Sequence, residues 1–457
     1  KHVRPWKSNK NFPFPTGFQA DVVIRQSWPP NFDELPSGLC GSACRVVHIL
    51  PWEFGTLPNS WISQIKTNID WLWAPSEYNR RVFEKSSVSP TNTAVVAAGV
   101  DCTSLSANHT RVMKKSSLDP VIFVFTGGFI PRKGVDILLE EWNEVFCSED
   151  AKISFPVAKL ILQTSYELGY SKSEISKFEQ LMDRCGNIEW KRGWMGRDEY
   201  LTMLKGGDVY IAPFRSEGFG IPIVESLFLG LSAIASVGGT AADDYMTPLS
   251  NLGEHAKHTL YPVSAREATC TKEPCRGNSL CVFLPCRLGS CACEKLVHQP
   301  SWFEVNREDL RNQMIQVYKD TVSHREKLSH PSFEAFLSLA GVHAETSDNN
   351  AKSFCWSSLV PAYNDAIMAV MKSPIRRTIP VFEHSALIQT PFLIKEAGLI
   401  VKAIVGNTPS ILPWVLISAV AFLAAYVLVW KKITLNAHLN GAYLKGRHKG
   451  MSKKAKQ

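Results

Sequence analysis

The sequence contains twelve cysteines but no Cys-x-x-Cys pair, so it lacks the ligand spacing of the common zinc-binding domains. Six of the cysteines lie close together: Cys270, Cys275, Cys281, Cys286, Cys291 and Cys293. We expect this cluster to form disulfides, in a pairing that the spacing does not decide. Disulfides require an oxidising compartment such as the secretory lumen. A cytosolic cluster of free thiols is the alternative.

The chain also lacks the charge pattern of a nucleic-acid-binding protein. Its formal net charge is +8, but residues 431–457 alone hold eight Lys or Arg and no acidic residue. This tail accounts for the whole excess, and the remaining residues are balanced in charge. We therefore expect no nucleic-acid partner.

Charge is absent altogether from residues 411–430. A helix of this length rises about 30 Å, which is the thickness of a bilayer core. Trp414 and Trp430, near its two ends, fit the aromatic belts of membrane interfaces. The run therefore predicts a transmembrane helix in contact with the bilayer, and a buried helix of a soluble core is the alternative.

The basic residues after this run predict its orientation. Positive residues collect on the cytosolic side of membrane helices, so residues 431–457 would form a cytosolic tail. The part before Ile411 would then lie in the lumen of the endoplasmic reticulum or Golgi, with residues 373–410 as a stalk. Asn108-His-Thr110 in this part is a glycosylation acceptor sequence. We expect a single-pass membrane glycoprotein of the secretory pathway.

Strand-like and helix-like segments alternate through most of the chain, from Asp21–Arg25 to Ser358–Met371. Such alternation predicts βαβ units and parallel sheets, and hence an α/β fold. A boundary near Asp119 divides the chain into residues 1–118 and 119–372, each expected to be a Rossmann-like domain. The cysteine cluster would be an insertion in the second domain, at residues 264–296.

The most specific local pattern follows the strand-like run Asp208–Pro213. It places Glu217 and Glu225 eight positions apart around a glycine turn and a helix start. Gly218 and Gly220 permit the turn, and the proline that follows them suits the first turn of a helix. The N–H groups at a helix start favour an anion, whereas carboxylates accept hydrogen bonds from hydroxyl groups. The pattern therefore indicates a site for a nucleotide sugar.

This pattern resembles the signature of family 4 glycosyltransferases, which are retaining enzymes of the GT-B fold. The resemblance implies that Glu217 contacts the transferred sugar and that Glu225 accepts hydrogen bonds from the ribose. It also implies backbone hydrogen bonds to the donor from Phe219, Gly220 and Ile221. Enzymes of this fold generally need no metal, so we expect neither a metal nor a cofactor beside the nucleoside diphosphate sugar. The acceptor, whether glycan, protein or lipid, is not indicated.

The loop after the strand-like run Val121–Phe125 resembles the same family. In that family it carries an arginine and a lysine that neutralise the donor diphosphate. Lys133 matches the lysine, and Gly127 and Gly128 belong to the same loop. Gly128 stands where the arginine is usual, and Arg132 is our candidate to replace it, because a guanidinium binds phosphate well. A solvated loop cation is the alternative for Arg132.

The first domain departs from the family pattern in two ways. His48 lies two or three positions before the place of the family's histidine, so we expect it to be a core residue. The glycine-rich loop that follows the family's first strand is missing, which implies that the chain is an N-terminally truncated enzyme. Ser358–Met371 would be the helix that crosses back to the first domain in GT-B enzymes. A membrane-anchored glycan-binding or scaffolding relative without catalysis is the alternative function.

Overall fold

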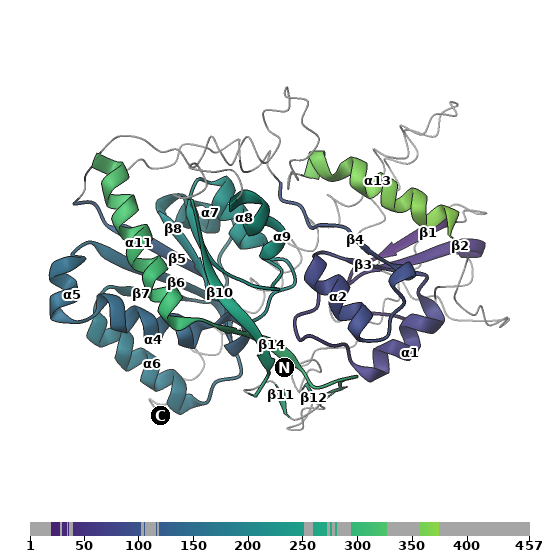
Figure 1. Ribbon diagram of the computed structural model, residues 1–457, viewed down its shortest axis with the longest axis horizontal. Coiled ribbons are helices and arrows are strands. Elements are labelled where there is room, and N and C mark those ends of the chain that lie inside the picture. Colours follow the sequence, from purple (N-terminus) through teal and green to yellow (C-terminus); the bar gives the residue numbers. More distant parts are fainter. Residues whose placement is uncertain are drawn as a thin grey trace, which may run out of the picture.

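The computed structural model describes residues 20–27, 30–33, 35, 40–101, 105, 116, 118–250, 259–271, 275–276, 279–280, 294–326 and 356–373. These residues form two α/β lobes that lie side by side, the N-terminal one in purple and blue and the C-terminal one mainly in teal and green (Figure 1). Each lobe is built on its own sheet of mainly parallel strands. The predicted α/β class with two Rossmann-like sheets is therefore confirmed.

The N-terminal lobe contains a four-stranded parallel sheet whose strands follow one another in chain order. The elements are β1 (Ala20–Arg25), β2 (Cys40–Ile49), α1 (Asn59–Asn68), β3 (Trp71–Ala74), α2 (Glu77–Lys85), η1 (Pro90–Asn92) and β4 (Thr93–Val95). Ser76 caps α2, because its Oγ accepts a hydrogen bond from the Asn79 N–H at 3.3 Å. Trp61 of α1 and Phe83 of α2 are buried in the same apolar cluster as Leu72 of the sheet.

The C-terminal lobe contains a seven-stranded sheet in the order β14-β10-β9-β8-β5-β6-β7. The strands are β5 (Val121–Phe129), β6 (Ala158–Glu167), β7 (Ile188–Arg192), β8 (Val209–Ala212), β9 (Ser232–Val237), β10 (Leu260–Thr269) and β14 (Ser301–Val305). All neighbouring strands are parallel except β10 and β14. The central strands β8 and β9 are buried along almost their whole length, as expected of a parallel sheet covered on both faces.

The helices of this lobe connect its parallel strands, as the sequence pattern predicted, except α11, which follows the last strand. They are η2 (Pro131–Lys133), α4 (Val135–Phe146), α5 (Glu149–Ser154), α6 (Lys172–Cys185), α7 (Arg197–Gly206), α8 (Ile221–Phe228), α9 (Asp243–Ser250) and α11 (Arg307–Glu326). The side chains of α4 that face inward, such as Trp142, are buried in the main apolar core with Phe123 of β5.

β10 is longer than predicted and moves the boundary of the cysteine-rich insertion. Residues 264–269, expected to open the insertion, belong to β10, and residues 265–269 pair with β14. The strand continues to Thr269 because β14 returns beside it and satisfies its backbone hydrogen bonds. The inserted loop begins after Thr269 and contains the short antiparallel strands β11 (Cys275–Arg276), β12 (Ser279–Leu280) and β13 (Glu294–Lys295).

Two disulfides are described in full. Cys270–Cys275 lies within the cysteine cluster, so the expectation of disulfides there is confirmed for this pair. The cluster members from Cys281 to Cys293 lie outside the described residues. Cys147–Cys185 joins the ends of α4 and α6, and the sequence did not predict it.

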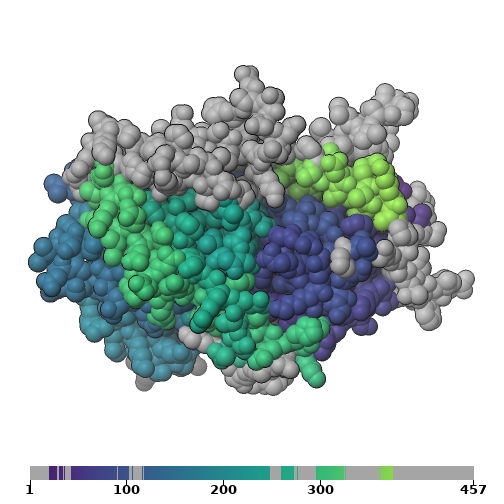
Figure 2. Space-filling model, in the orientation of Figure 1, coloured from purple at the N-terminus to yellow at the C-terminus, as the bar shows by residue number. Residues whose placement is uncertain are grey.

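Residues 294–303, which we call the strap, lead into β14 of the C-terminal lobe and also contact the N-terminal lobe. The Val297 N–H donates to the Leu57 carbonyl at 2.9 Å. Trp302 and Phe303 are buried in the apolar cluster of the N-terminal lobe. Figure 2 shows the green strap region beneath the blue and purple lobe. The contact between the lobes is therefore a packed apolar core.

α13 (Trp356–Lys372) follows the C-terminal lobe in the chain but packs against the N-terminal one (Figure 1). Val370 is fully buried in a cluster with side chains of β2 and β3. The Tyr363 hydroxyl donates to the Ala97 carbonyl at 3.1 Å. The predicted helix Ser358–Met371 is present and crosses back as expected.

Several sequence predictions fall outside the described residues. They are the transmembrane helix 411–430, the tail 431–457, the stalk beyond Ser373, and the glycosylation sequence at Asn108. Within the ranges that the structure describes, no helix combines the length and apolar character that crossing a membrane requires.

Candidate active site

The carboxyl edges of the two sheets meet at the interface between the lobes. Pro51 follows β2 and lies against the loop of the glutamate motif, between β8 and α8, which we call the motif loop. A Cβ on Gly218 of this loop would be 3.1 Å from the Pro51 Cβ. After β3, the Ser76 hydroxyl donates to the Gly218 carbonyl at 2.7 Å. Ligands of parallel α/β sheets bind outside the carboxyl ends of the strands. This interface is therefore the expected place for a ligand.

The topology of the C-terminal sheet selects the position more closely. β6 and β7 lie on one side of β5, whereas β8, β9 and β10 lie on the other. Such a reversal of strand order leaves a crevice between the two neighbouring loops, here those after β5 and β8. The sequence predicted that these two loops converge. The loop after β5 is shorter than predicted, because β5 continues to Phe129 and includes Gly127 and Gly128.

Lys133 and Glu217 form an ion pair in this crevice, and both side chains are largely buried. The Lys133 Nζ also lies 4.1 Å from the centre of the Phe214 ring. The Arg132 guanidinium is 3.9 Å from Glu217, and its side chain is only 17% exposed, so Arg132 is not a solvated loop cation. Burial opposes the ionisation of Glu217, but Lys133 and Arg132 lower its pKa below the ordinary value. Burial lowers the pKa of Lys133, and the charge of Glu217 opposes this effect. Glu217 is therefore an anion beside two basic side chains.

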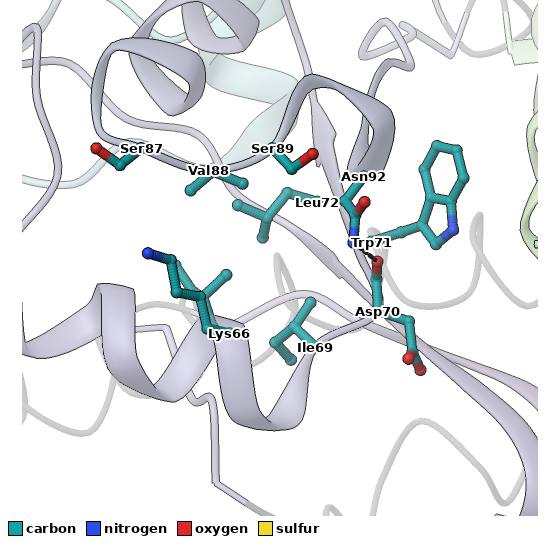
Figure 3. A pocket seen from close by; sticks show the side chains of 10 residues that line it. Lys66, Ile69, Asp70, Trp71, Leu72, Ser87, Val88, Ser89 and Asn92 are labelled. Carbon is teal, nitrogen blue, oxygen red and sulfur yellow. Dashed lines mark hydrogen bonds between the residues drawn. The ribbon is translucent and has the colours of Figure 1, made fainter. Parts of the chain in front are cut away.

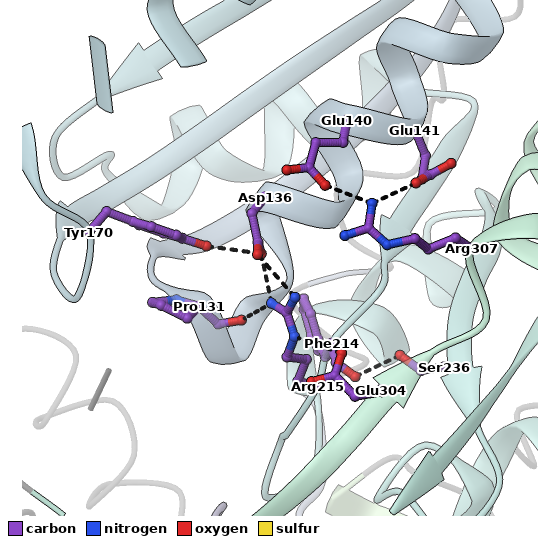
Figure 4. A network of polar contacts seen from close by, with 10 residues as sticks. All are labelled: Pro131, Asp136, Glu140, Glu141, Tyr170, Phe214, Arg215, Ser236, Glu304 and Arg307. Carbon is purple, nitrogen blue, oxygen red and sulfur yellow. Dashed lines mark hydrogen bonds and ion pairs between the residues drawn. The ribbon is translucent and has the colours of Figure 1, made fainter. Parts of the chain in front are cut away.

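Buried polar contacts tie the two loops together. The Arg215 N–H donates to the Arg132 carbonyl at 2.8 Å. The Arg215 guanidinium, 1% exposed, donates to the two carboxylate oxygens of Asp136 at 2.6 and 3.0 Å (Figure 4). Tyr170 donates a further hydrogen bond to Asp136 at 3.0 Å. Asp136 lies in the first turn of α4, just after Lys133, so this ion pair positions the motif loop relative to Lys133.

Glycine allows the backbones of these loops to approach each other. Gly134 has φ +66°, and a Cβ there would lie 2.0 Å from the Pro213 carbonyl oxygen. Gly127 lies beside the stem of Lys133, since a Cβ at Gly127 would be 3.6 Å from the Lys133 Cε. The turn that holds Lys133 against the motif loop therefore depends on Gly134.

Gly128 leaves room for an aromatic side chain from β6. A Cβ at Gly128 would lie 2.6 Å from the Tyr166 ring. Burial lowers the pKa of Arg132, but the charges of Glu53 and Glu217 and a hydrogen bond with Tyr166 outweigh this effect and raise it. Tyr166 therefore lies beside Gly128, which stands where the family's arginine is usual, and it also contacts Arg132.

The start of α8 lies directly beside Glu217. Gly220 has φ +92°, and a Cβ there would be 2.6 Å from the Tyr245 hydroxyl and 3.6 Å from the Glu217 Cγ. Phe219 is buried, with its ring centre 5.8 Å from that of Tyr245, and Ile221 begins the helix. The positive end of the helix dipole therefore points at the crevice.

Glu225 lies on α8 and is 3% exposed. Its Oε1 is 2.6 Å from Arg197 Nη2, and its Oε2 accepts a hydrogen bond from Tyr200 at 2.9 Å. Burial raises the pKa of Tyr200 well above its ordinary value, so this hydroxyl stays protonated. Each carboxylate oxygen has a second lone pair, so Glu225 can accept hydroxyl hydrogen bonds in addition.

The N-terminal lobe contributes one carboxylate to the site. The Glu53 Oε1 is 3.3 Å from Arg132 Nη2, and the Glu53 side chain is 13% exposed. Burial raises the pKa of Glu53, and the charge of Arg132 opposes this effect. Glu53 follows the carboxyl end of β2, so it reaches the crevice from the opposite sheet.

Four residues of this site were not predicted from the sequence: Glu53, Tyr166, Arg197 and Tyr200. Glu53, Tyr166 and Arg197 lie at or just after the carboxyl ends of β2, β6 and β7. That placement is the signal that could have identified them, because the carboxyl edge of a parallel sheet is where ligands bind. Their contacts with the motif are tertiary and have no sequence pattern.

His48 is a core residue, as expected. It is fully buried on β2, and its Nδ1 lies 2.9 Å from the Ile49 carbonyl oxygen. Its Nε2 has no hydrogen-bond partner among the described residues. Burial lowers the pKa of His48 to about 4, so the ring is neutral at physiological pH.

Asp243 and Asp244 bind backbone N–H groups. Asp243 accepts a hydrogen bond from the Gly238 N–H at 2.9 Å. Asp244 accepts one from the Glu77 N–H at 2.8 Å, across the lobe interface. In the part of the chain that the structure describes, no group of three or more His, Cys, Asp or Glu side chains is arranged to hold a metal ion.

A separate depression in the N-terminal lobe is shown in Figure 3, with Lys66, Leu72 and Ser89 among the residues that line it. Asn92 donates to the Asp70 carbonyl at 3.0 Å on one side of it. Asp70 and Asn92 precede β3 and β4, so the depression lies at the amino edge of the sheet. It is therefore not part of the site at the carboxyl edges.

Two facing Rossmann-like sheets with a ligand crevice between them define a GT-B-like architecture. Residues 120–251, which contain both loops of the site, match the model of the family described as Glycosyl transferases group 1. The segment that holds both loops of the site therefore matches the group 1 glycosyltransferases, as the glutamate motif predicted. Among curated proteins, none matches the chain.

The chain is also similar to several solved structures. A glycosyltransferase from Rickettsia africae shares 12% identity with a TM-score of 0.46, over 73% of this chain and 72% of that one. Sucrose-phosphate synthase from Thermosynechococcus elongatus shares 13% with a TM-score of 0.44, over 72% and 68%. HepE from Anabaena in complex with UDP-glucose shares 13% with a TM-score of 0.42, over 71% and 72%. Similarities this low carry no argument about activity.

Proposed function

We propose that the protein transfers a sugar from a nucleoside diphosphate sugar to an acceptor with retention of configuration. The observation that carries this proposal is the convergence of Lys133, Arg132 and the start of α8 around Glu217. Two cations and a helix N-terminus suit a diphosphate leaving group. A carboxylate between them suits the hydroxyl groups of a sugar.

Each group has a distinct part in the proposed transfer. Arg132 and Lys133 neutralise the charge that develops on the departing diphosphate, and the α8 N–H groups add to this effect. Glu217 orients the sugar. Lys133 is paired with Glu217 in this structure, so donor binding exchanges that pair for contacts with phosphate and hydroxyl. Glu225, held by Arg197 and Tyr200, accepts the ribose hydroxyls.

The test is donor turnover by the full chain and by Glu225→Gln. Release of nucleoside diphosphate is measured with a panel of UDP-, GDP- and ADP-sugars. We expect the variant to lose about 10- to 100-fold in kcat/KM, the value of a hydrogen bond to a charged group. Glu141→Gln is the matched control, because Glu141 is a carboxylate 2% exposed that is also bound by arginines, but on α4.

The control separates a functional loss from general destabilisation. Equal losses in Glu225→Gln and Glu141→Gln would contradict the assigned role of Glu225. Absence of turnover by the unchanged protein across the whole panel would contradict the enzyme function. That result would favour the alternative of a membrane-anchored glycan-binding relative without catalysis.

We also propose that residues 411–430 anchor the enzyme in the membrane, with the catalytic lobes in the lumen. The charge-free run, its basic flank and the two disulfides support this arrangement. In sealed microsomes, protease should remove a tag placed after Gln457 and leave the lobes intact until detergent is added. Digestion of the lobes in intact microsomes would contradict the orientation.

A further inference from the structure

Glu53 places a negative charge where the proposed donor needs positive charge. Glu53 and Glu217 balance Arg132 and Lys133, so the four side chains have no net formal charge. Among the described residues, the titratable groups that interact with this cluster include four tyrosine hydroxyls, whose protonated forms carry no charge: Tyr78, Tyr166, Tyr210 and Tyr245. A diphosphate entering this crevice would meet a neutral cluster, in which Arg132 already has a partner.

The backbone of Glu53 is fixed on both sides. The Tyr78 hydroxyl donates to the Glu53 carbonyl at 3.1 Å and accepts a hydrogen bond from the Gly55 N–H, also at 3.1 Å. Trp52 is fully buried, and its indole N–H donates to the Thr56 carbonyl at 2.8 Å. The loop therefore keeps its place at the carboxyl edge of the sheet.

The strap holds the same loop from the opposite side. The Ser301 N–H donates to the Phe54 carbonyl at 3.3 Å, and the Ser301 hydroxyl fills the space beside Gly55, where a Cβ would lie 1.9 Å away. The strap also reaches the motif loop, since the Phe303 N–H donates to the Arg215 carbonyl at 2.8 Å. The strap therefore sets the position of Glu53 relative to the motif loop.

We propose that Glu53 is the positioning residue that the N-terminal lobe adds to the donor site: its carboxylate competes with the diphosphate for Arg132. The inference rests on the proposed function, because it assigns Arg132 to the diphosphate. By returning to Arg132, Glu53 weakens the hold on the nucleoside diphosphate product and favours its release. A buried cation requires a neighbouring negative charge. The carboxylate of Glu53 supplies that charge to Arg132 while the site holds no diphosphate.

The experiment measures the affinity of the full chain for inorganic pyrophosphate by calorimetry. Pyrophosphate supplies the diphosphate chemistry and does not depend on the unknown base or sugar. Glu53→Gln removes the competing charge at nearly constant shape, so we expect it to bind pyrophosphate about tenfold more tightly, or about 1.4 kcal/mol. Glu84→Gln is the control, because Glu84 is a carboxylate of the same lobe that pairs with Arg80 on α2.

A pH series distinguishes competition by charge from a structural effect. Burial raises the pKa of Glu53, whereas the neighbouring cations lower that of Glu217, so falling pH neutralises Glu53 first. The affinity advantage of Glu53→Gln over the unchanged protein should therefore shrink as the pH falls and Glu53 becomes protonated. Protonation of pyrophosphate itself affects both proteins equally and cancels in this ratio.

The outcomes separate this inference from the proposed function. Binding that Lys133→Gln weakens but Glu53→Gln does not tighten would overturn the role of Glu53 and leave the donor site standing. A tenfold gain that Glu84→Gln reproduces, or that does not change with pH, would also overturn it. No binding of pyrophosphate by either the unchanged protein or Glu53→Gln would overturn both proposals.

Discussion

At the scale of single residues, the site depends on one glycine, which has no side chain that could contact a ligand. Gly134 connects η2 to α4 with φ +66° and lies under the Pro213 carbonyl. Lys133 precedes it and Pro213 leads into the motif, so the contact between these two backbones sets the distance from Lys133 to Glu217. A side chain at Gly134 would therefore disturb the ion pair without touching it.

We predict that Gly134→Ala lowers the free energy of unfolding by about 2 kcal/mol or more. The left-handed backbone accounts for about 1 kcal/mol, and the collision with the Pro213 carbonyl adds to it. Gly186→Ala is the matched control, since Gly186 has φ +73° but open space around it. Chemical denaturation measures both values, and pyrophosphate affinity should fall only in Gly134→Ala. Equal losses of stability in the two variants would show that the backbone contact is unimportant.

The sequence predicted the residues of the site that belong to contiguous motifs. Lys133, Glu217 and Glu225 could be assigned because each lies in a short pattern with its own glycines or proline. Glu53 and Tyr166 could not, because their place beside Arg132 arises only when two sheets and two strands are brought together. For the same reason, the sequence does not decide whether Arg132 binds phosphate or is a solvated loop cation. Its burial depends on Glu53 of the other lobe.

At the scale of elements, periodicity predicted the strands and helices of the second domain well. It did not predict how far β10 extends, because the extension depends on β14, which returns more than thirty residues later. The Cys147–Cys185 disulfide was missed for a similar reason. The two cysteines are 38 residues apart and become neighbours only when α4 and α6 pack together.

We predict that the two disulfides differ in their contribution to stability. In the chain-entropy account, the stabilisation grows with the length of the closed loop. Replacing both Cys147 and Cys185 by Ala, which opens a loop of 38 residues, should cost about 4 kcal/mol. Replacing both Cys270 and Cys275, which close a loop of five, should cost about 2 kcal/mol. Denaturation under non-reducing conditions measures both, and a larger loss for the short loop would contradict the prediction.

At the scale of the whole molecule, two segments from the C-terminal half of the chain pack against the N-terminal lobe at different faces. The strap packs Trp302 and Phe303 into the N-terminal core beside the site. α13 packs Val370 against the other apolar cluster of the same lobe. The sequence predicted the crossing of α13 by family resemblance, whereas the strap, which follows the end of the predicted cysteine-rich insertion 264–296, was not predicted. The strap therefore links the two lobes beside the site, and α13 covers the N-terminal sheet.

The role of α13 can be tested by placing a charge at two adjacent positions. Val370 is fully buried, so the carboxylate of Val370→Asp would lie in an apolar cluster, which costs several kcal/mol. Releasing the helix avoids that cost, so we expect faster hydrogen exchange in α13 and β1 and a lower melting temperature. Met371 is 44% exposed, and Met371→Asp should change stability by no more than about 0.5 kcal/mol. Unchanged exchange in Val370→Asp, or an equal effect of both substitutions, would mean that α13 does not support the N-terminal sheet.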